Sequence, residues 1–338
     1  MRALQCDEFG TVDRVRLVER PAPADPGPHE VIIEVAYASV SHAVGLMVEG
    51  RYQTKPPRPF TPGTEAVGHV VAAGASVTRF KPGDAVAAIA DWGCFAERIK
   101  LPEYTVYAIP EGLPLLDALP IPISYGTAYT GLLWRCALQP GETVLVLGAG
   151  AGVGLAAVEL AVQMGAQVIA CASTQAKRDE AVRRGAIGAV APGAELAAQV
   201  KMLTEGRGAD VIVDPVGGEL FGHAVRAAAH NARLLSIGFA SGAMPVVPPN
   251  IMLVKNLTLH GFFYGRYIGW TPADERIVHA PAMQHAMQTM LGWARDRRIR
   301  PTVAQVFPLA ELSNALDALH SRQVIGKLAL SIKKETTR

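Results

Sequence analysis

The stretch that decides the fold is Thr143-Val-Leu-Val-Leu-Gly-Ala-Gly-Ala-Gly-Val-Gly154. Its first five residues are rich in Val and Leu and lie between Pro140-Gly141 and a run of glycines, which predicts a strand buried on both faces. The apolar residues from Gly154 to Met164, followed by Gly165, predict a helix directly after the glycines. A strand, a glycine turn and a helix together present backbone N–H groups and the positive end of a helix to a phosphate.

The glycine turn departs from the strict G-x-G-x-x-G spacing of dinucleotide-binding proteins, because the three glycine positions hold Ala149, Ala151 and Gly154. The segments that follow nevertheless favour a nucleotide-binding sheet. A strand is predicted at 167–171, a basic helix at 175–184, and strands and helices alternate to about residue 237. We therefore expect the turn to hold a pyrophosphate, through Ala149, Gly150, Ala151, Gly152, Val153 and Gly154. A glycine-rich turn in another kind of α/β protein remains the alternative.

The composition of the chain excludes several classes of protein. At 338 residues two domains are the default, and 50% hydrophobic residues with 18% charged residues allow a large core. A net charge of +2 gives no general attraction to nucleic acid or to anionic membranes. There is no apolar run of about 18 residues and no secretory segment at the start, so we expect a cytoplasmic protein without membrane contact. The four cysteines are scattered without a C-x-x-C pair, which argues against a zinc ribbon or a disulfide framework.

The first third of the chain has a different sequence pattern. Short strand-like runs at 31–37, 66–73 and 85–90 are separated by Pro and Gly, which is typical of a β-rich domain. We expect residues 91–98 to resume the sheet and residues 110–114 to lead into a helical connector.

The last third is predicted to return from the nucleotide-binding sheet to the first domain. Residues 256–264 predict a sixth strand of that sheet, and pairing this edge with its twin would give a homodimer. Residues 282–298 predict an amphipathic helix, and residues 324–332 a closing strand. The arginines between 295 and 300 are interpreted as a solvated helix end, with binding of single-stranded RNA as the alternative.

Six ordered motifs carry a family resemblance: Pro62-Gly-Thr-Glu-Ala-Val-Gly68, Phe80-Lys-Pro-Gly-Asp84, Gly126-Thr-Ala-Tyr129, Gly141-Glu-Thr-Val-Leu-Val146, Ala149-Gly-Ala-Gly-Val-Gly154 and Gly326-Lys327. In this order they resemble the medium-chain dehydrogenase/reductase superfamily, and within it the zinc-independent quinone oxidoreductase branch. The resemblance implies an α/β protein with a GroES-like β-rich catalytic domain at 1–118 and 263–338. It also implies a Rossmann domain with a doubly wound parallel sheet at 119–262.

The same resemblance predicts that the protein holds no metal. At the two positions where the zinc branch has Cys and His, this chain has Ser41 and Thr64, which are not usual zinc ligands. A scattered site made from His42, Glu65 and His69 stays open, and with it a zinc-dependent alcohol dehydrogenase. Without zinc there is no Lewis acid to lower the pKa of an alcohol, so the chemistry favours reduction of a quinone or an activated carbon–carbon double bond.

By resemblance, residues 41–52 line the substrate cleft. Ser41 and Val44 replace the Asn and Asp of the quinone reductase pattern, so the polar surroundings of the substrate are altered. The phenol of Tyr52 is expected to hydrogen-bond a substrate carbonyl and stabilise a developing enolate, and His42 is a candidate proton relay. The alternatives are a tyrosine ring packed over a loop and an exposed histidine without a role.

The identity of the cofactor depends on the end of the second strand. An NAD enzyme places an acid there, but this chain has none before Asp179. Ser173 and Thr174 can donate to a 2′-phosphate, and Lys177 and Arg178 can neutralise it, so we expect NADPH. The alternative is that Ser173 or Thr174 caps the helix while the two cations face solvent.

Further cofactor contacts are predicted from the resemblance and from the position of strand ends. Thr127 is expected to reach the nicotinamide side, with an N-cap role for a Ser or Thr of the 124–129 segment as the alternative. The remaining candidates are Gly238, Phe239, Phe262, Phe263 and Lys327, with Phe263 also facing the substrate. The sequence as a whole predicts an NADPH-dependent, zinc-independent reductase of quinones or α,β-unsaturated carbonyl compounds. The alternative outside enzymology is a quinone-reductase-like protein that mainly binds RNA or serves a structural role.

Overall fold

The computed structural model describes residues 1–332. The described chain divides into two compact units, here called the first unit (residues 1–123 and 265–332) and the second unit (Ser124–Tyr264). Each unit has its own hydrophobic core.

The second unit is built on a six-stranded parallel sheet with the order β10-β9-β8-β11-β12-β13. Its strands are β8 (Thr143–Leu147), β9 (Gln167–Cys171), β10 (Gly188–Val190), β11 (Ala209–Asp214), β12 (Ala228–Ser236) and β13 (Thr258–Gly261). The chain runs outward from β8 through β9 to β10, then restarts at β11 on the other side of β8. The order therefore reverses between β8 and β11, which is the switch point where doubly wound sheets bind their ligands.

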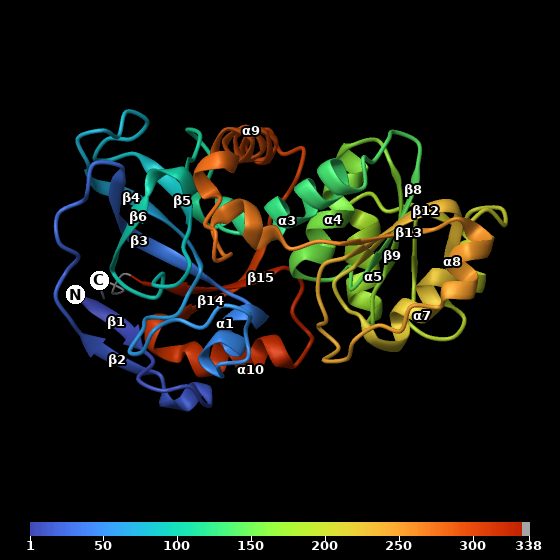
Figure 1. The fold of residues 1–338 in the computed structure, drawn as a ribbon, viewed down its shortest axis with the longest axis horizontal. Coiled ribbons are helices and arrows are strands. Elements are labelled where there is room, and N and C mark those ends of the chain that lie inside the picture. Colours follow the sequence, from blue (N-terminus) through green and yellow to red (C-terminus); the bar gives the residue numbers. More distant parts are fainter. Residues whose placement is uncertain (333–338) are drawn as a thin grey trace. The chain divides into compact units, whose positions relative to one another are not determined.

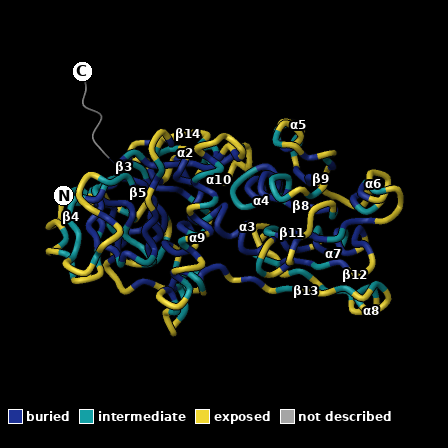
Figure 2. The backbone as a smooth tube through the Cα atoms, turned by 90° about the horizontal axis from the view of Figure 1, so that it is seen from above, coloured by how far each residue is buried: buried dark blue, intermediate teal, exposed yellow. Residues whose placement is uncertain are grey.

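Helices cover this sheet, as Figure 1 shows. They are α3 (Gly126–Thr130), α4 (Gly152–Gln163), α5 (Gln175–Arg183), α6 (Leu196–Leu203), α7 (Gly218–Ala227) and α8 (Pro249–Lys255). All five residues of β8 are buried, as expected for a central strand with helices on both faces. In Figure 2 the backbone of β8 and β11 is buried, whereas α5 and α8 carry exposed residues. The expected Rossmann-like parallel sheet is confirmed.

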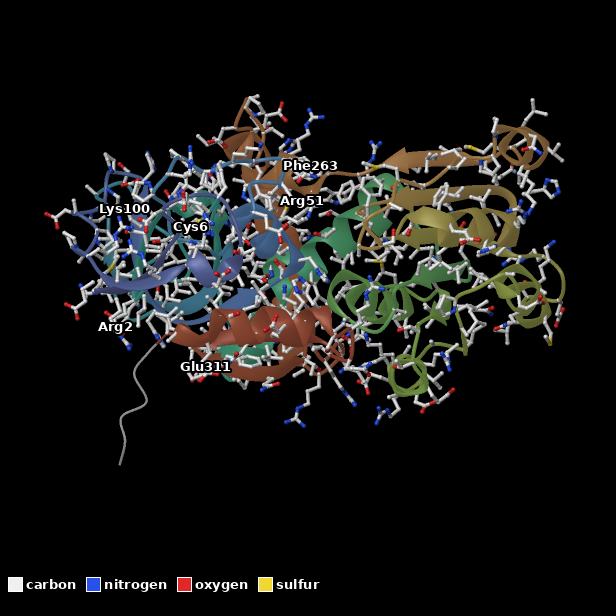
Figure 3. All side chains as sticks on the ribbon, turned by 90° about the horizontal axis from the view of Figure 1, so that it is seen from below. Arg2, Cys6, Arg51, Lys100, Phe263 and Glu311 are labelled. Atoms are coloured by element: carbon white, nitrogen blue, oxygen red, sulfur yellow. The ribbon has the colours of Figure 1, made fainter. Side chains whose placement is uncertain are left out.

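The first unit contains a seven-stranded, mainly antiparallel sheet with the order β14-β15-β3-β4-β5-β7, and β6 pairs with β3. The strands are β3 (Glu30–Val40), β4 (Glu65–Ala73), β5 (Ala85–Ile89), β6 (Arg98–Pro102), β7 (Val106–Ala108), β14 (Val303–Pro308) and β15 (Lys327–Ser331). A separate hairpin joins β1 (Arg2–Gln5) and β2 (Arg16–Glu19). The helices are α1 (His42–Val48), α2 (Leu115–Ala118), α9 (Arg276–Arg295) and α10 (Leu312–His320). Figure 3 shows Cys6, just after β1, within the body of this unit.

The prediction that residues 91–98 resume the sheet is wrong for residues 91–95, because β6 begins only at Arg98 and is preceded by a single bridge between Ala96 and Ala3. Residues 91–95 fold back as a loop instead. The backbone N–H groups of Cys94 and Phe95 donate to the carbonyls of Gly63 and Pro62. A Cβ on Gly63 would lie 2.5 Å from the Phe95 ring, so the loop packs where only glycine fits.

Two helix predictions also need correction. The helix predicted at 282–298 is α9, which starts earlier, at Arg276, carries Pro281 inside it and ends at Arg295. The predicted N-cap in the 124–129 segment is absent, because the chain is already helical from Ile121 and Tyr125 precedes α3 in a helical conformation without a capping side chain. The acceptor near the start of this helical run is the carboxylate of Glu65, which accepts from the N–H of Ile123 at 2.7 Å.

Candidate active site

The turn between β8 and α4 leaves a space beside its glycines that larger side chains would fill; this turn is called the phosphate cradle below. A Cβ on Gly154 would lie 2.1 Å from the carbonyl oxygen of Gly148, and one on Gly150 would lie 2.4 Å from Cδ of Lys177. Gly148 and Gly152 have φ of +62° and +49°, which L side chains rarely adopt. Ala151 precedes α4 in an extended conformation and supplies no capping side chain. The first turn of α4 therefore offers its N–H groups to an anion, and the cradle fits a pyrophosphate.

Asp214, at the end of β11, shapes the other side of this turn. Its Oδ1 accepts from the N–H groups of Val216 at 2.8 Å and Gly217 at 2.9 Å. Val216 in turn packs on Gly148, where an added Cβ would lie 3.0 Å from its Cγ2. Burial raises the pKa of Asp214, and the two N–H groups oppose that rise. Asp214 is not among the residues predicted from the sequence, although an acid at a strand end followed by Pro-Val-Gly-Gly was the available signal.

Gly238 and Phe239 lie at the same edge of the sheet. The N–H of Ile237 donates to the carbonyl of Asp214, and the N–H of Ala240 donates to that of Pro215. The Phe239 ring lies over Gly217, since a Cβ there would be 3.0 Å from its Cδ1, and 44% of Phe239 is exposed. Both predicted residues therefore stand at the carboxyl ends of the strands, beside the glycine turn.

The end of β9 brings together the residues predicted to recognise a 2′-phosphate. Thr174 caps α5, because its hydroxyl accepts from the N–H of Lys177 at 3.3 Å. Lys177 is only 8% exposed, with its aliphatic stem against Gly150. The guanidinium of Arg178 donates to the carbonyl of Ala172 at 2.8 Å. The capping alternative thus holds for Thr174, but Lys177 does not face solvent, and Ser173 is exposed beside both.

The acid nearest to this position is turned away along the helix. Asp179 accepts a hydrogen bond from the side chain of Gln175 at 2.6 Å, and the same glutamine accepts from Arg178 at 2.9 Å. The groups held at the end of β9 are therefore hydroxyls and cations, with no carboxylate between Cys171 and Asp179.

Three further predicted residues belong to the second unit. Thr127 is buried inside α3. Phe262 is 8% exposed and packs against Gly131, where a Cβ would lie 3.7 Å from its ring. Phe263 is 39% exposed and lies on the chain that follows β13 (Figure 3). Of the two aromatics, Phe262 is buried and Phe263 is partly exposed.

The predicted substrate residues belong to the first unit. Ser41 precedes α1 in an extended conformation, and its hydroxyl makes no capping hydrogen bond. Tyr52 is half-buried, and its ring meets the Trp270 ring edge-on, with centroids 6.3 Å apart at 82°. Within the described chain, its hydroxyl has no hydrogen-bond partner. Burial raises the pKa of Tyr52 to about 12, so the phenol remains a donor at neutral pH.

His42 opens α1 on the surface of the same unit. Its ring centroid lies 5.9 Å from that of His320 on α10. Partial burial lowers the pKa of His42, and the neighbouring His320, Arg322 and Lys327 lower it further. His42 is therefore neutral at neutral pH, which suits an acceptor or relay better than a permanent cation.

A buried ion pair joins β15 to β4. Nζ of Lys327 lies 3.3 Å from Oε2 of Glu65, with side chains 8% and 1% exposed. The pairing of Leu328 with Val40 places Lys327 beside Ser41. From the sequence, Lys327 is predicted to approach the cofactor, and Glu65 is considered only as part of a scattered metal site with His42 and His69. Their pairing was missed because 262 positions separate them, although both lie in the motifs that carried the resemblance.

Within residues 1–332, no group of three or more His, Cys, Asp or Glu side chains is arranged to share a metal ion. No helix in that range is long and apolar enough to span a membrane.

Residues 27–111 match the family model described as alcohol dehydrogenase GroES-like domain, and residues 152–279 match the one described as zinc-binding dehydrogenase. The chain is 36% identical over 334 residues to quinone oxidoreductase-like protein 2 of Rattus norvegicus, which covers 98% of this chain and 92% of that protein.

Two solved structures show the same similarity in three dimensions. One is the quinone oxidoreductase of Thermus thermophilus, described also in its complex with NADPH, with a TM-score of 0.82, 32% identity and coverage of 98% of this chain and 100% of that one. The other is described as an NAD-dependent alcohol dehydrogenase, with a TM-score of 0.88, 27% identity and coverage of 98% and 100%.

Proposed function

The chain belongs to the quinone oxidoreductase-like branch of the medium-chain dehydrogenase/reductase superfamily, and we propose that it reduces quinones or α,β-unsaturated carbonyl compounds with NADPH. We assign cofactor binding to the glycine turn and the end of β9 in the second unit. We assign contact with the substrate to Ser41 and Tyr52 in the first unit. The proposed reaction uses no zinc, because Ser41 and Thr64 stand where the zinc branch has Cys and His.

The observation that carries the choice of NADPH is the end of β9. Lys177 is held against Gly150 of the phosphate cradle, and Arg178 is anchored on the carbonyl of Ala172. A 2′-phosphate would meet these two charges, whereas an unphosphorylated ribose would find no carboxylate to accept its 2′-hydroxyl. The NADPH complex described for the Thermus thermophilus relative supports the same choice.

The remaining groups act on the substrate. NADPH, when held at the glycine turn, would supply the hydride for an electron-poor carbon of the substrate, and solvent would supply the proton that completes the reduction. The phenol of Tyr52 is protonated at neutral pH and makes no hydrogen bond in the described chain, so it is available to a substrate oxygen that gains negative charge. The aromatic surface of Phe263 is proposed to contact the apolar part of the substrate.

The test is a steady-state screen in which the purified protein oxidises NADPH or NADH with quinones, enones and primary alcohols in separate assays. We expect turnover with NADPH and a quinone or enone, and weaker use of NADH. Metal analysis of the same preparation accompanies the assays. NADH-linked alcohol oxidation with stoichiometric zinc would show that the zinc-dependent alternative is right and this proposal is wrong.

A further inference from the structure

Arg276 clamps the segment that leads into α9. It is 9% exposed, and its Nη2 donates to both carboxylate oxygens of Asp91 at 3.0 Å. Its Nε donates to Asp274 at 2.6 Å. A buried arginine held by two carboxylates from separate parts of the chain is costly to move, since displacing it leaves charges uncompensated.

The clamp fixes the backbone immediately before Trp270. Gly269 has φ of +89°, and a Cβ there would lie 2.2 Å from Nε of Arg276. Nη2 of Arg276 also donates to the carbonyl of Gly269 at 3.4 Å, and the N–H of Trp270 donates to the carbonyl of Gly265 at 2.8 Å. The backbone at Trp270 is therefore held by the Arg276 guanidinium at Gly269 and by the hydrogen bond from the Trp270 N–H to the carbonyl of Gly265.

Trp270 meets the predicted substrate residue Tyr52. The two rings are nearly perpendicular, at 82°, the edge-to-face arrangement that aromatic pairs prefer. The buried Nε1 of Trp270 makes no regular hydrogen bond in the described chain. One continuous set of contacts thus runs from Asp91 and Arg276 through the carbonyl of Gly269 and the adjoining Trp270 to Tyr52.

We propose that Trp270 determines the size of the acceptor that can reach the hydroxyl of Tyr52, and that the contact between Arg276 and Asp91 holds it in that role. The inference rests on the proposed function and specifies its substrate site further. An indole beside the hydrogen-bonding group occupies space that a fused aromatic ring of a larger quinone would need. Its removal should therefore favour larger acceptors over smaller ones of the same chemistry.

The test compares kcat/KM for 1,4-benzoquinone and 9,10-phenanthrenequinone in the wild type, Trp270→Phe and Trp270→Ala. We expect the ratio to shift toward the larger quinone by about tenfold or more in Trp270→Ala and less in Trp270→Phe, because removing a few apolar atoms from a pocket changes discrimination about 10- to 200-fold. KM for NADPH should stay unchanged in both. Arg276→Met should shift the ratio in the same direction, and Arg276→Lys should restore part of the discrimination.

The matched control is Arg266→Met, which breaks an exposed pair with Glu275 in the same segment and should leave the ratio unchanged. If the Arg276 variants do not fold, Trp270→Phe, which keeps an aromatic ring, still tests whether the size of the side chain at position 270 sets the ratio of kcat/KM for the two quinones. Retained turnover of both quinones with an unchanged ratio in Trp270→Ala would overturn this inference and leave the proposed function standing. A wild type that reduces no quinone or enone would overturn both.

Discussion

At the scale of single residues, we propose that the choice of cofactor depends on the side chains of Lys177 and Arg178. Lys177→Ala and Arg178→Ala should each raise KM for NADPH about 10- to 100-fold, because a hydrogen bond to a charged group contributes about 1.5–3 kcal/mol and each 1.4 kcal/mol is a factor of ten. KM for NADH should change little. Initial-rate kinetics with both cofactors measures the two effects.

Arg183→Met is the control for these variants. Arg183 lies on the same helix, but its side chain is 69% exposed and pairs with Glu180. An equal rise in KM for NADPH and NADH in the Lys177 and Arg178 variants would show that these residues stabilise the helix and do not bind the 2′-phosphate.

Tyr52→Phe tests the proposed hydrogen bond to the substrate. We expect kcat/KM to fall about 100-fold, near the lower end of what removal of one oxyanion donor costs. The hydroxyl has no hydrogen-bond partner in the described chain, so the thermal midpoint should change little. Activity measurements and thermal denaturation on the same preparation separate catalysis from folding.

The raised pKa of Tyr52 makes a further prediction about pH. Burial favours the neutral phenol and raises its pKa from 10.0 to about 12. The donor therefore persists through the pH range in which an exposed tyrosine would lose its proton. The contribution of Tyr52, taken as the wild-type to Tyr52→Phe ratio of kcat/KM, should stay constant from pH 7 to about pH 10.5. A decline of that ratio centred near pH 10 would contradict it.

At the scale of elements, the glycine turn is tested by Gly154→Ala. The new Cβ would meet the carbonyl of Gly148 at 2.1 Å, so the start of α4 must shift away from the end of β8. We expect a loss of about 1–3 kcal/mol in the free energy of unfolding, the usual cost of overpacking, together with weakened NADPH binding. Gly292→Ala is the control, because nothing lies within 4 Å of its added Cβ on α9. Urea denaturation and calorimetric titration with NADPH measure both effects.

The contact between β15 and β4 is tested by a double-mutant cycle on Lys327 and Glu65. Lys327→Met leaves the buried carboxylate without its cation, and we expect a loss of about 3–5 kcal/mol in the free energy of unfolding. Adding Glu65→Gln to that variant should recover part of the loss. Additive losses in the cycle, measured by urea denaturation, would show that the two side chains do not interact.

Elements were predictable where the signal was local. β8 and β9 have the predicted bounds, because short apolar runs between turn residues predict buried strands directly. The start of α9 was missed because Pro281 usually marks the beginning of a helix, whereas here the helix passes through it. The start of the α3 segment was missed because its partner is Glu65, which is 58 positions away from Ile123.

The residues of the candidate site were likewise predictable only where they lie close together in the sequence. The glycine turn and the residues at the end of β9 follow one another in the chain, so sequence patterns alone bring them together. The pairing of Lys327 with Glu65 and the clamp of Arg276 on Asp91, 185 positions apart, depend on how distant segments meet. No single-sequence pattern encodes such contacts, and Trp270 was therefore not among the predicted site residues.

At the scale of the whole molecule, the open edge of the parallel sheet predicts how two copies of the chain associate. β13 ends the sheet and pairs only with β12 among the described strands. Several exposed apolar side chains lie on this strand, on α8 and on the loop before it: Met244, Val246, Leu253, Val254 and Leu259. An open strand edge and exposed apolar side chains are both features that association of two copies would cover. We therefore expect a homodimer through this edge, with twice the chain mass of 35.8 kDa.

Light scattering coupled to size exclusion measures this mass over a range of concentrations. The double variant Val254→Asp/Leu259→Lys should dissociate the dimer, because it places charges where apolar side chains would be buried against the second copy. Met202→Asp is the control, since Met202 is 77% exposed on α6, beside β10 at the other end of the sheet. A wild type that is monomeric at all concentrations would contradict the expected dimer. A dimer that Met202→Asp disrupts and the double variant does not would show that the interface lies elsewhere.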